Sequence, residues 1–189
     1  PANAVTDWRI NRITVGANGN GLHQYRSYGT ASPLNIESNT VDAAASAVFA
    51  DVLTWGINVR EVQGTSTTTI LSNTVGASGG QFARGINLWN LPTTSTVIVS
   101  GGSVANSAVG INLDNVDGVA GAGASTAVVV SNVTVAASCE IGLLIRSAMF
   151  NAIAAANAVS VNLNNSTVAG INDAIRVETD STFTADLIM

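Results

Sequence analysis

Lysine is absent from this sequence of 189 residues, and all seven of its basic residues are arginines. The absence excludes a lysine Schiff base and an activated lysine amine as catalytic devices. Twelve carboxylates give a formal net charge of -5 at pH 7. We therefore expect no nucleic-acid partner, because the chain lacks a basic footprint, and no electrostatic attraction to an anionic membrane surface.

Cysteine is almost absent too, because Cys139 is the only one. No intramolecular disulfide can form within this sequence, and we expect Cys139 to be a small buried apolar residue. The sequence also lacks an apolar run of about 18 residues, so we expect no membrane insertion by this segment. It begins at Pro1 without a methionine or a signal peptide, which favours a processed product or an excerpt of a longer chain.

Charged and aromatic residues are scarce, at 10% and 5%, whereas hydrophobic residues make up 47%. The hydrophobic share comes mainly from Ala, Val, Ile and Leu, and Gly, Ser, Thr and Asn fill most of the remainder. This composition is typical of short stacked strands joined by tight turns. In such structures β-branched side chains pack inward, and Asn or Gly forms the corners.

The sequence does contain a repeated unit, which has the form Gly-Ile-Asn-Leu-Asp-Asn at residues 110–115. Its second and fourth positions are apolar, which predicts a short strand with these two side chains facing inward and the third and fifth facing outward. One such unit cannot bury its apolar face alone, so repeated copies predict a solenoid. The copies, some of them imperfect, begin at Gly21, Gly56, Gly85, Gly110, Gly142 and Ala174.

A pair formed by a hydroxyl residue and valine accompanies each copy and recurs about every thirty residues. A longer alternating run precedes each pair, and asparagines mark the corner between the two at 39, 73, 132 and 165. Equivalent strands in such a coil run in the same direction. The pattern predicts an all-β, single-stranded parallel β-helix of about six rungs, each with three short strands, as a single domain over residues 1–189. The hydroxyl residues of the pairs are Thr14, Thr40, Thr74, Ser103, Thr134 and Thr167.

Two lateral inserts interrupt the repeat, near residues 42–55 and 147–156. The first is consistent with a helix capped by Asp42 or with an extra strand around Val48 to Val52. The second has a helical composition, with Met149, Phe150 and Ile153 on one face. Lateral loops are where solenoids carry special contacts, so both inserts are expected to leave the coil.

By its repeat architecture the chain resembles the right-handed parallel β-helix superfamily, which includes pectate-lyase-like folds and autotransporter passenger domains. The resemblance implies a right-handed coil and covers the chain from about Trp8 to Met189. Superfamily members that hydrolyse pectin use Asn-Thr-Asp, Asp-Asp, Gly-His-Gly and Arg-Ile-Lys motifs, and none of these occurs here. Members of the lyase type use clustered carboxylates for calcium and a basic residue. The nearest match is Asp114 with Asp117, and with Arg146 one rung away, which makes Ca²⁺ the only cofactor candidate, although calcium prefers about six to eight oxygen ligands.

Stacking of the copies in register predicts two outward columns. The fifth positions are Tyr25, Arg60, Trp89, Asp114, Arg146 and Glu178, and the third positions are His23, Asn58, Asn87, Asn112, Leu144 and Arg176. Aromatic residues and arginine are favoured in contacts, so these columns are a candidate binding face for a glycan or another protein. The alternative is that the face only satisfies itself, with Asp114 and Arg146 paired across rungs. The candidate binding residues are Tyr25, Arg60, Trp89, Asp114, Arg146, Asn58, Asn87 and Asn112.

These observations favour a non-catalytic extracellular scaffold of microbial origin, secreted or at the cell surface. It would be a passenger, an adhesin segment or a self-assembling filament subunit. The alternative is a polysaccharide-binding β-helix or a polysaccharide-cleaving one, of the lyase or glycoside hydrolase type. His23, the sole histidine, has no partner for a triad or a zinc site, so neither is expected. The open ends of a β-helix have unpaired backbone groups, which predicts end-to-end self-association, and a glycan or host-surface ligand is the other expected partner.

Overall fold

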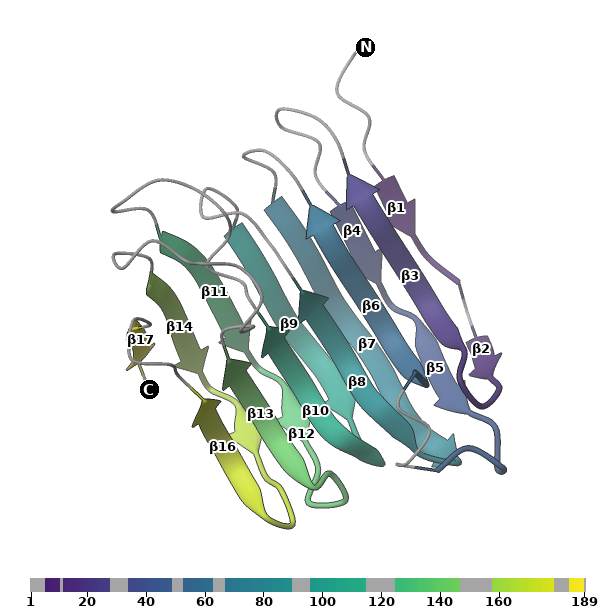
Figure 1. Ribbon diagram of the computed structural model, residues 1–189. Coiled ribbons are helices and arrows are strands. Elements are labelled where there is room, and N and C mark those ends of the chain that lie inside the picture. Colours follow the sequence, from purple (N-terminus) through teal and green to yellow (C-terminus); the bar gives the residue numbers. More distant parts are fainter. Residues whose placement is uncertain are drawn as a thin grey trace.

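The computed structural model describes residues 6–10, 12–27, 34–48, 53–62, 67–89, 96–114, 125–146, 158–178 and 184–188. Within these ranges every regular element is a β-strand, and all strand pairs are parallel. The strands belong to two sheets, which the chain visits alternately (Figure 1). The predicted parallel β-helix is therefore confirmed.

The six-stranded sheet contains the Gly-Ile-Asn-Leu copies, one in each strand, in the spatial order β16-β13-β10-β8-β6-β3. It is the nearer layer in Figure 1. Its strands are β3 (Asn20–Ser27), β6 (Trp55–Val62), β8 (Phe82–Trp89), β10 (Ser107–Asp114), β13 (Ile141–Arg146) and β16 (Asp173–Glu178).

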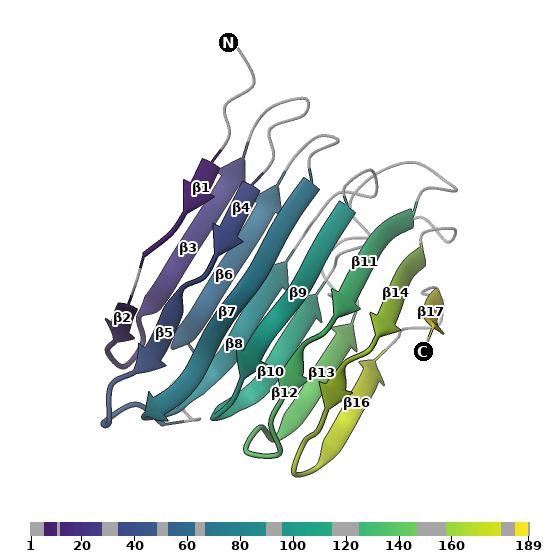
Figure 2. The ribbon, with the colours of Figure 1, turned by 180° about the vertical axis from the view of Figure 1, so that it is seen from behind.

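The second sheet has eleven strands and is the nearer layer in Figure 2. The first strands of successive rungs are β1 (Thr6–Trp8), β4 (Leu34–Glu37), β7 (Thr67–Gly79), β9 (Thr96–Val104), β11 (Ser125–Ser131), β14 (Ala158–Asn164) and β17 (Thr184–Ile188). The short strands beyond the first corner are β2 (Arg12–Val15), β5 (Thr40–Ala43), β12 (Thr134–Val135) and β15 (Thr167–Val168). In the middle of the coil β7 and β9 each run through that corner, so two of the predicted three strands merge into one bent strand.

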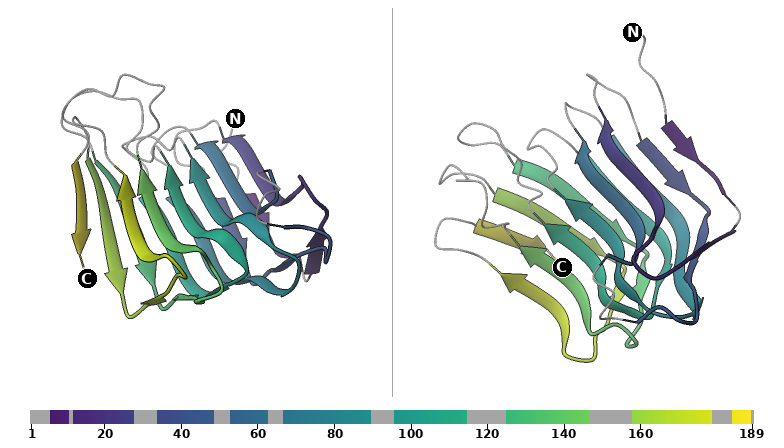
Figure 3. Two further views of the ribbon diagram at one scale, coloured as in Figure 1. Left: turned by 60° about the horizontal axis from the view of Figure 1, so that its bottom comes forward. Right: turned by 45° about the vertical axis from the view of Figure 1, so that its right-hand side comes forward.

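The chain descends along the eleven-stranded sheet and returns along the six-stranded one, advancing from β1 toward β17 as a right-handed coil (Figures 1 and 2). Strands of each sheet lie side by side along the coil axis (Figure 3). Apolar side chains at the second position of each copy form an inward column between the sheets. Ile57, Ile86, Ile111 and Leu143 are paired in register and are between 0% and 3% exposed. Burial of such a side chain contributes about 1.5–3 kcal/mol, so this column supplies much of the coil's cohesion.

Glycine at the first position of five of the six copies has a steric reason, and the sixth copy begins with Ala174. A Cβ at Gly110 would lie 2.7 Å from the carbonyl oxygen of Gly142 in the next rung and 2.6 Å from Cγ1 of Val135. A Cβ at Gly21, Gly56, Gly85 or Gly142 would likewise lie less than 3 Å from other atoms. The missing side chain therefore lets successive rungs approach closely at this position of the strand.

The corner asparagines were predicted to share one role, and the structure divides them. Asn132 and Asn165 have φ angles of 54° and 46°, so they occupy the left-handed region, which asparagine tolerates at a tight corner, and their amides are hydrogen-bonded to each other. In the earlier rungs Ser38 and Ser72 hold that conformation instead, one residue before Asn39 and Asn73. Those two amides are buried inside the corner, where Asn39 Nδ2 donates to Asn73 Oδ1 at 2.9 Å and Asn73 Nδ2 donates to the carbonyl of Ile36.

The predicted column of hydroxyl residues holds for five of six rungs. Thr40, Thr74, Ser103, Thr134 and Thr167 are paired in register. Thr14 does not belong to this column, because the residue opposite Thr40 is Arg12. The shift is two residues, which keeps the inward and outward faces of a strand unchanged, so alternation alone does not reveal it.

A helix capped by Asp42, one of the two alternatives for the first insert, is not present at that residue, because Asp42 lies in strand β5. Its buried carboxylate accepts hydrogen bonds from Arg12 Nη2 at 2.9 Å and from the backbone N–H of Ser78 at 3.0 Å. A strand satisfies this carboxylate through neighbouring rungs, which a lateral helix would not. The alternative strand from Val48 to Val52 and the insert at 147–156 lie mainly or wholly outside the described residues.

Candidate functional site

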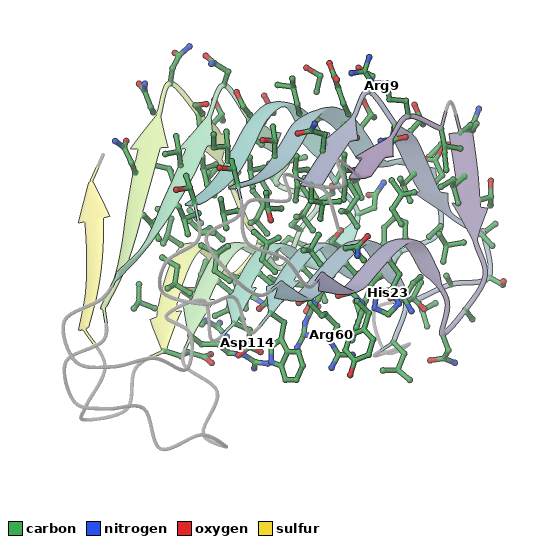
Figure 4. The ribbon with its side chains drawn as sticks, turned by 90° about the horizontal axis from the view of Figure 1, so that it is seen from above. Arg9, His23, Arg60 and Asp114 are labelled. Carbon is green, nitrogen blue, oxygen red and sulfur yellow. The ribbon has the colours of Figure 1, made fainter. Side chains whose placement is uncertain are left out.

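The two predicted outward columns are in register along the six-stranded sheet. One column is Tyr25, Arg60, Trp89, Asp114, Arg146 and Glu178, and the other is His23, Asn58, Asn87, Asn112, Leu144 and Arg176. Figure 4 shows the labelled His23, Arg60 and Asp114 on the side of this sheet that faces away from the other sheet. We call this side the outer face.

The expected exposure of the outer face is wrong for the asparagines. Asn58, Asn87 and Asn112 are 0%, 1% and 0% exposed, although they point away from the core. Among the larger side chains of this face, Arg84 contacts the asparagine column, because its Nη1 donates to Asn87 Oδ1. The asparagines are therefore a buried polar layer beneath the surface, and not contact residues.

These amides form a hydrogen-bonded series that we call the amide ladder, made of Asn20, Asn58, Asn87 and Asn112. Each Nδ2 donates to the Oδ1 of the preceding rung, at 2.9 Å from Asn58, 2.8 Å from Asn87 and 2.7 Å from Asn112. All the bonds run in one direction. The ladder stops at Asn112 because Leu144 occupies the next rung, and Asn112 Oδ1 is buried without a hydrogen-bond partner.

Above the ladder lies an arginine–aromatic cluster, which we define as Tyr25, Trp55, Arg60, Arg84 and Trp89. The Arg60 Cζ atom is 4.2 Å from the ring centroid of Trp89, 5.7 Å from that of Tyr25 and 5.8 Å from that of Trp55. Arg84 Cζ lies 5.5 Å from the Trp55 ring. Cation–π contacts of this kind contribute about 0.5–2 kcal/mol each, so they hold the two guanidinium groups in place over the sheet.

Trp55 and Arg84 were missed as members of this face. Both stand one residue before the glycine of their copy, and they are paired in register. The repeat was defined from the glycine onward, so this position was not considered, although comparing the residues before each glycine would have found both. Arg84 Nη1 also donates to Asn87 Oδ1 at 3.3 Å, which connects the cluster to the ladder. Burial lowers the pKa of Arg84, as do Arg146 and Arg60, whereas Asp114 opposes them.

Asp114 and Arg146 form the ion pair that was predicted across rungs. Arg146 Nη2 and Nε donate to the same oxygen, Oδ2 of Asp114, at 2.6 Å and 2.8 Å. The Asp114 side chain is 4% exposed, and its other oxygen, Oδ1, is buried without a hydrogen-bond partner. The carboxylate is thus directed at a guanidinium group rather than at an open site.

The calcium candidate gains no further ligand from the described residues. In that part of the chain, no three or more His, Cys, Asp or Glu side chains are grouped so that they could hold a metal ion. Asp117 lies outside it. Asp114 alone, with one oxygen bound by Arg146, supplies far fewer oxygen ligands than the roughly six to eight that calcium takes.

His23 and Cys139 do not meet. His23 lies in β3, whereas Cys139 precedes β13. Strands β6, β8 and β10 lie between β3 and β13 in the sheet. His23 is exposed beside the ring of Tyr25, and partial burial together with the positive charge of Arg60 lowers its pKa. Cys139 is buried as expected. Its burial raises the thiol pKa, and hydrogen bonds with Ser107 lower it in part.

Comparisons of this chain with protein-family models, with curated proteins and with solved structures each found no match. Among the described residues, the structure contains no helix with the length and apolar character needed to span a membrane.

Proposed function

We propose that this chain is a non-catalytic, extracellular structural or adhesive scaffold, a rigid β-helix of the passenger or adhesin kind. The observation that carries the proposal is the amide ladder together with the Asp114–Arg146 pair. These polar groups connect one rung to the next. A catalytic site instead needs polar groups that converge on one reacting atom.

The remaining support comes from composition and architecture. A low content of charge, the absence of lysine and a single buried cysteine suit a durable secreted or cell-surface protein of a microbe. The parallel β-helix architecture is shared with the pectate-lyase-like and autotransporter-passenger superfamily that the sequence resembles. That architecture accommodates scaffolds and enzymes alike, so the site and not the fold favours the scaffold.

The test is an assay for turnover on a panel of neutral and acidic polysaccharides, with and without Ca²⁺. New reducing ends and unsaturated products are measured for the natural chain and for Asp114→Asn. We expect no product above a heat-denatured control for either protein. Turnover by the natural chain that is lost in Asp114→Asn would refute the scaffold and support a lyase.

A second candidate is a polysaccharide-binding module, and a specific observation favours it. Arg60 lies between the rings of Tyr25 and Trp89, and Tyr25 is 46% exposed. Aromatic faces held at successive rungs offer flat apolar surfaces, and the guanidinium groups offer hydrogen-bond donors for hydroxyl or carboxylate groups. Such a module would bind along the outer face without cleaving its ligand.

The binding candidate is tested with Trp89→Ala on an array of immobilised glycans. The control is Ile171→Ala, which removes an apolar side chain that is 63% exposed and lies away from the cluster, whereas Trp89 is half-buried. We expect a glycan bound by the natural chain to be lost with Trp89→Ala and retained with Ile171→Ala. If no glycan binds the natural chain, or if Trp89→Ala retains every glycan, the binding candidate is rejected.

A further inference from the structure

Arg60 is held in place by aromatic rings and not by hydrogen bonds. Its Cζ atom lies over the rings of Trp89, Tyr25 and Trp55, at distances of 4.2 Å, 5.7 Å and 5.8 Å from the ring centroids. It makes no hydrogen bond or ion pair with any residue that the structure describes. The N–H donors of a guanidinium group lie in its plane, so contacts with ring faces leave them available. Because Arg60 is only half-buried, a ligand can reach these donors from the outer face.

Arg84 places a second guanidinium group beside the same tryptophan, with its Cζ atom 5.5 Å from the centroid of the Trp55 ring. One of its N–H groups donates to the amide ladder, and it forms no ion pair with another described residue. Burial lowers the pKa of Arg84, and the positive charges of Arg146 and Arg60 lower it further, whereas Asp114 raises it. An anion bound between Arg60 and Arg84 would stabilise the charged form of both.

The region of unpaired positive charge is small. Arg60 belongs to β6 and Arg84 to β8, which are neighbouring strands and therefore about 4.8 Å apart along the coil axis. The next strand, β10, contributes Asp114, whose charge is balanced by Arg146. On the other side, β3 contributes His23, whose pKa is lowered by partial burial and by Arg60. Among the described residues of this face, the unpaired cations therefore suit one anionic group and not a row of them.

We propose that Arg60 and Arg84 bind the carboxylate of a single acidic sugar residue at the end of a glycan. The proposal rests on the polysaccharide-binding candidate and names the class of ligand that this candidate would take. A guanidinium group matches a carboxylate with two parallel N–H···O bonds, which are strong because both partners are charged. A neutral glycan would leave both positive charges without a partner. A polymer with a carboxylate on every residue would gain little more than one such residue, because the neighbouring described strands offer no further unpaired arginine.

The test measures binding to two matched pairs of glycans by isothermal titration calorimetry. One pair is sialyllactose and lactose, and the other is an oligosaccharide ending in glucuronate and its counterpart ending in glucose. The two pairs distinguish a terminal sialic acid from a terminal uronic acid as the source of the carboxylate. We expect the acidic member of at least one pair to bind the natural chain at least about tenfold more tightly than its neutral match, because the neutral glycan lacks the charge-assisted bonds.

The variant that removes the site is Arg60→Gln, which we expect to weaken binding of the acidic glycan by at least about tenfold. Arg176→Gln is the matched control, since it removes the same charge from the same face. Arg176 lies in β16, three strands beyond β8 and hence roughly 14 Å along the axis, and it is already paired with Asp173. Circular dichroism checks that both variants are folded. If Arg60→Gln does not fold, the matched glycans still test the proposal on the natural chain.

Four outcomes overturn the proposal. Equal binding of the acidic and the neutral glycans would leave the polysaccharide-binding candidate standing without a carboxylate site. If none of the four glycans binds, the carboxylate site is rejected, and the array of immobilised glycans decides separately whether the binding candidate is rejected with it. A short glutamate peptide that binds as tightly as the acidic glycan would show that an acidic protein segment is the partner. Finally, equal weakening by Arg60→Gln and Arg176→Gln would place the carboxylate elsewhere.

Discussion

Asparagine suits the third position of the repeat because parallel stacking places each residue beside its own counterpart in the next rung. A carboxylate or a guanidinium group in such a column would repel its neighbours. An amide has both a donor and an acceptor, so a column of amides satisfies itself in one direction. This explains how Asn58, Asn87 and Asn112 are buried on an outward face without paired charges.

The first prediction concerns the amide ladder. Asn87→Ala removes the donor to Asn58 Oδ1 and the acceptor of Asn112 Nδ2, both of which are buried. A buried polar group left without its partner costs about 1–3 kcal/mol, so we expect a loss of about 2 kcal/mol or more in the free energy of unfolding. Chemical denaturation measures it. Asn162→Ala, at an exposed position of β14, is the control and should change stability by less than about 0.5 kcal/mol; equal losses would contradict the ladder.

The second prediction concerns the ion pair across rungs. Arg146→Ala leaves the Asp114 carboxylate, 4% exposed, without its cation, and we expect a loss of roughly 3 kcal/mol because the remaining charge is buried. Arg176→Ala is the control, since Arg176 and Asp173 are 39% and 37% exposed and such pairs contribute under about 1 kcal/mol. Thermal melts at low and high salt check both variants. Similar melting temperatures for the two would show that the burial of Asp114 has no energetic consequence.

The third prediction concerns pH. The pKa of His23 is lower in the folded chain than in the unfolded chain, so near the unfolded value the unfolded chain binds more protons. Stability from this group is therefore complete above about pH 6.5 and is lost as the pH falls toward the folded pKa. His23→Gln removes the effect. As the pH falls from about 8 to about 5, we expect the natural chain to lose more unfolding free energy than the variant. A difference in unfolding free energy that does not depend on pH would contradict this prediction.

At the scale of the strand, glycine and not the apolar residues decides how closely rungs stack. Gly110→Ala would push a Cβ to 2.7 Å from a backbone carbonyl and 2.6 Å from Val135, and backbone yields less readily than a flexible side chain. We expect a loss of about 3 kcal/mol, measured by denaturation. Gly16→Ala is the control, because no atom lies within 4 Å of its Cβ position. A control as damaging as Gly110→Ala would mean that the close approach of the Cβ to the next rung is not the cause of the loss, because restricting the backbone of the unfolded chain by itself stabilises a fold.

At the scale of the whole molecule, each rung contacts only its neighbours, so the position of a defect along the coil matters. Ile111→Asp puts an unpaired charge into the fully buried column of a central rung, and we expect loss of most β-sheet signal in circular dichroism. Ile175→Asp places the same change in the same column at the edge strand β16. There we expect local fraying with most of the signal and most of the melting transition retained. Complete unfolding by both variants would show that the coil is a single cooperative unit.

Strand location, direction and most of the register could be predicted from the sequence. The repeat begins with glycine and has apolar residues at two fixed positions, and both features aligned the six copies correctly. The first rung was the exception, since a shift of two residues at Thr14 preserves the alternation of faces. The inward role of Ile111 was also predicted, because only an apolar column fills the space between the sheets.

By itself, then, the sequence determined a parallel coil, because units too small to bury their own apolar faces can do so only by stacking. Only the tertiary structure decided what happens on the outer face. Burial there depends on side chains from neighbouring columns and rungs, so Asn87 is covered although its strand position is outward. Arg84 joins the cluster for the same reason, since it contacts Trp55 across strands β8 and β6, whereas the contact between Trp55 and Arg60 lies within β6. Alternation along one strand specifies the direction of a side chain, whereas its exposure is set by neighbours far away in the chain.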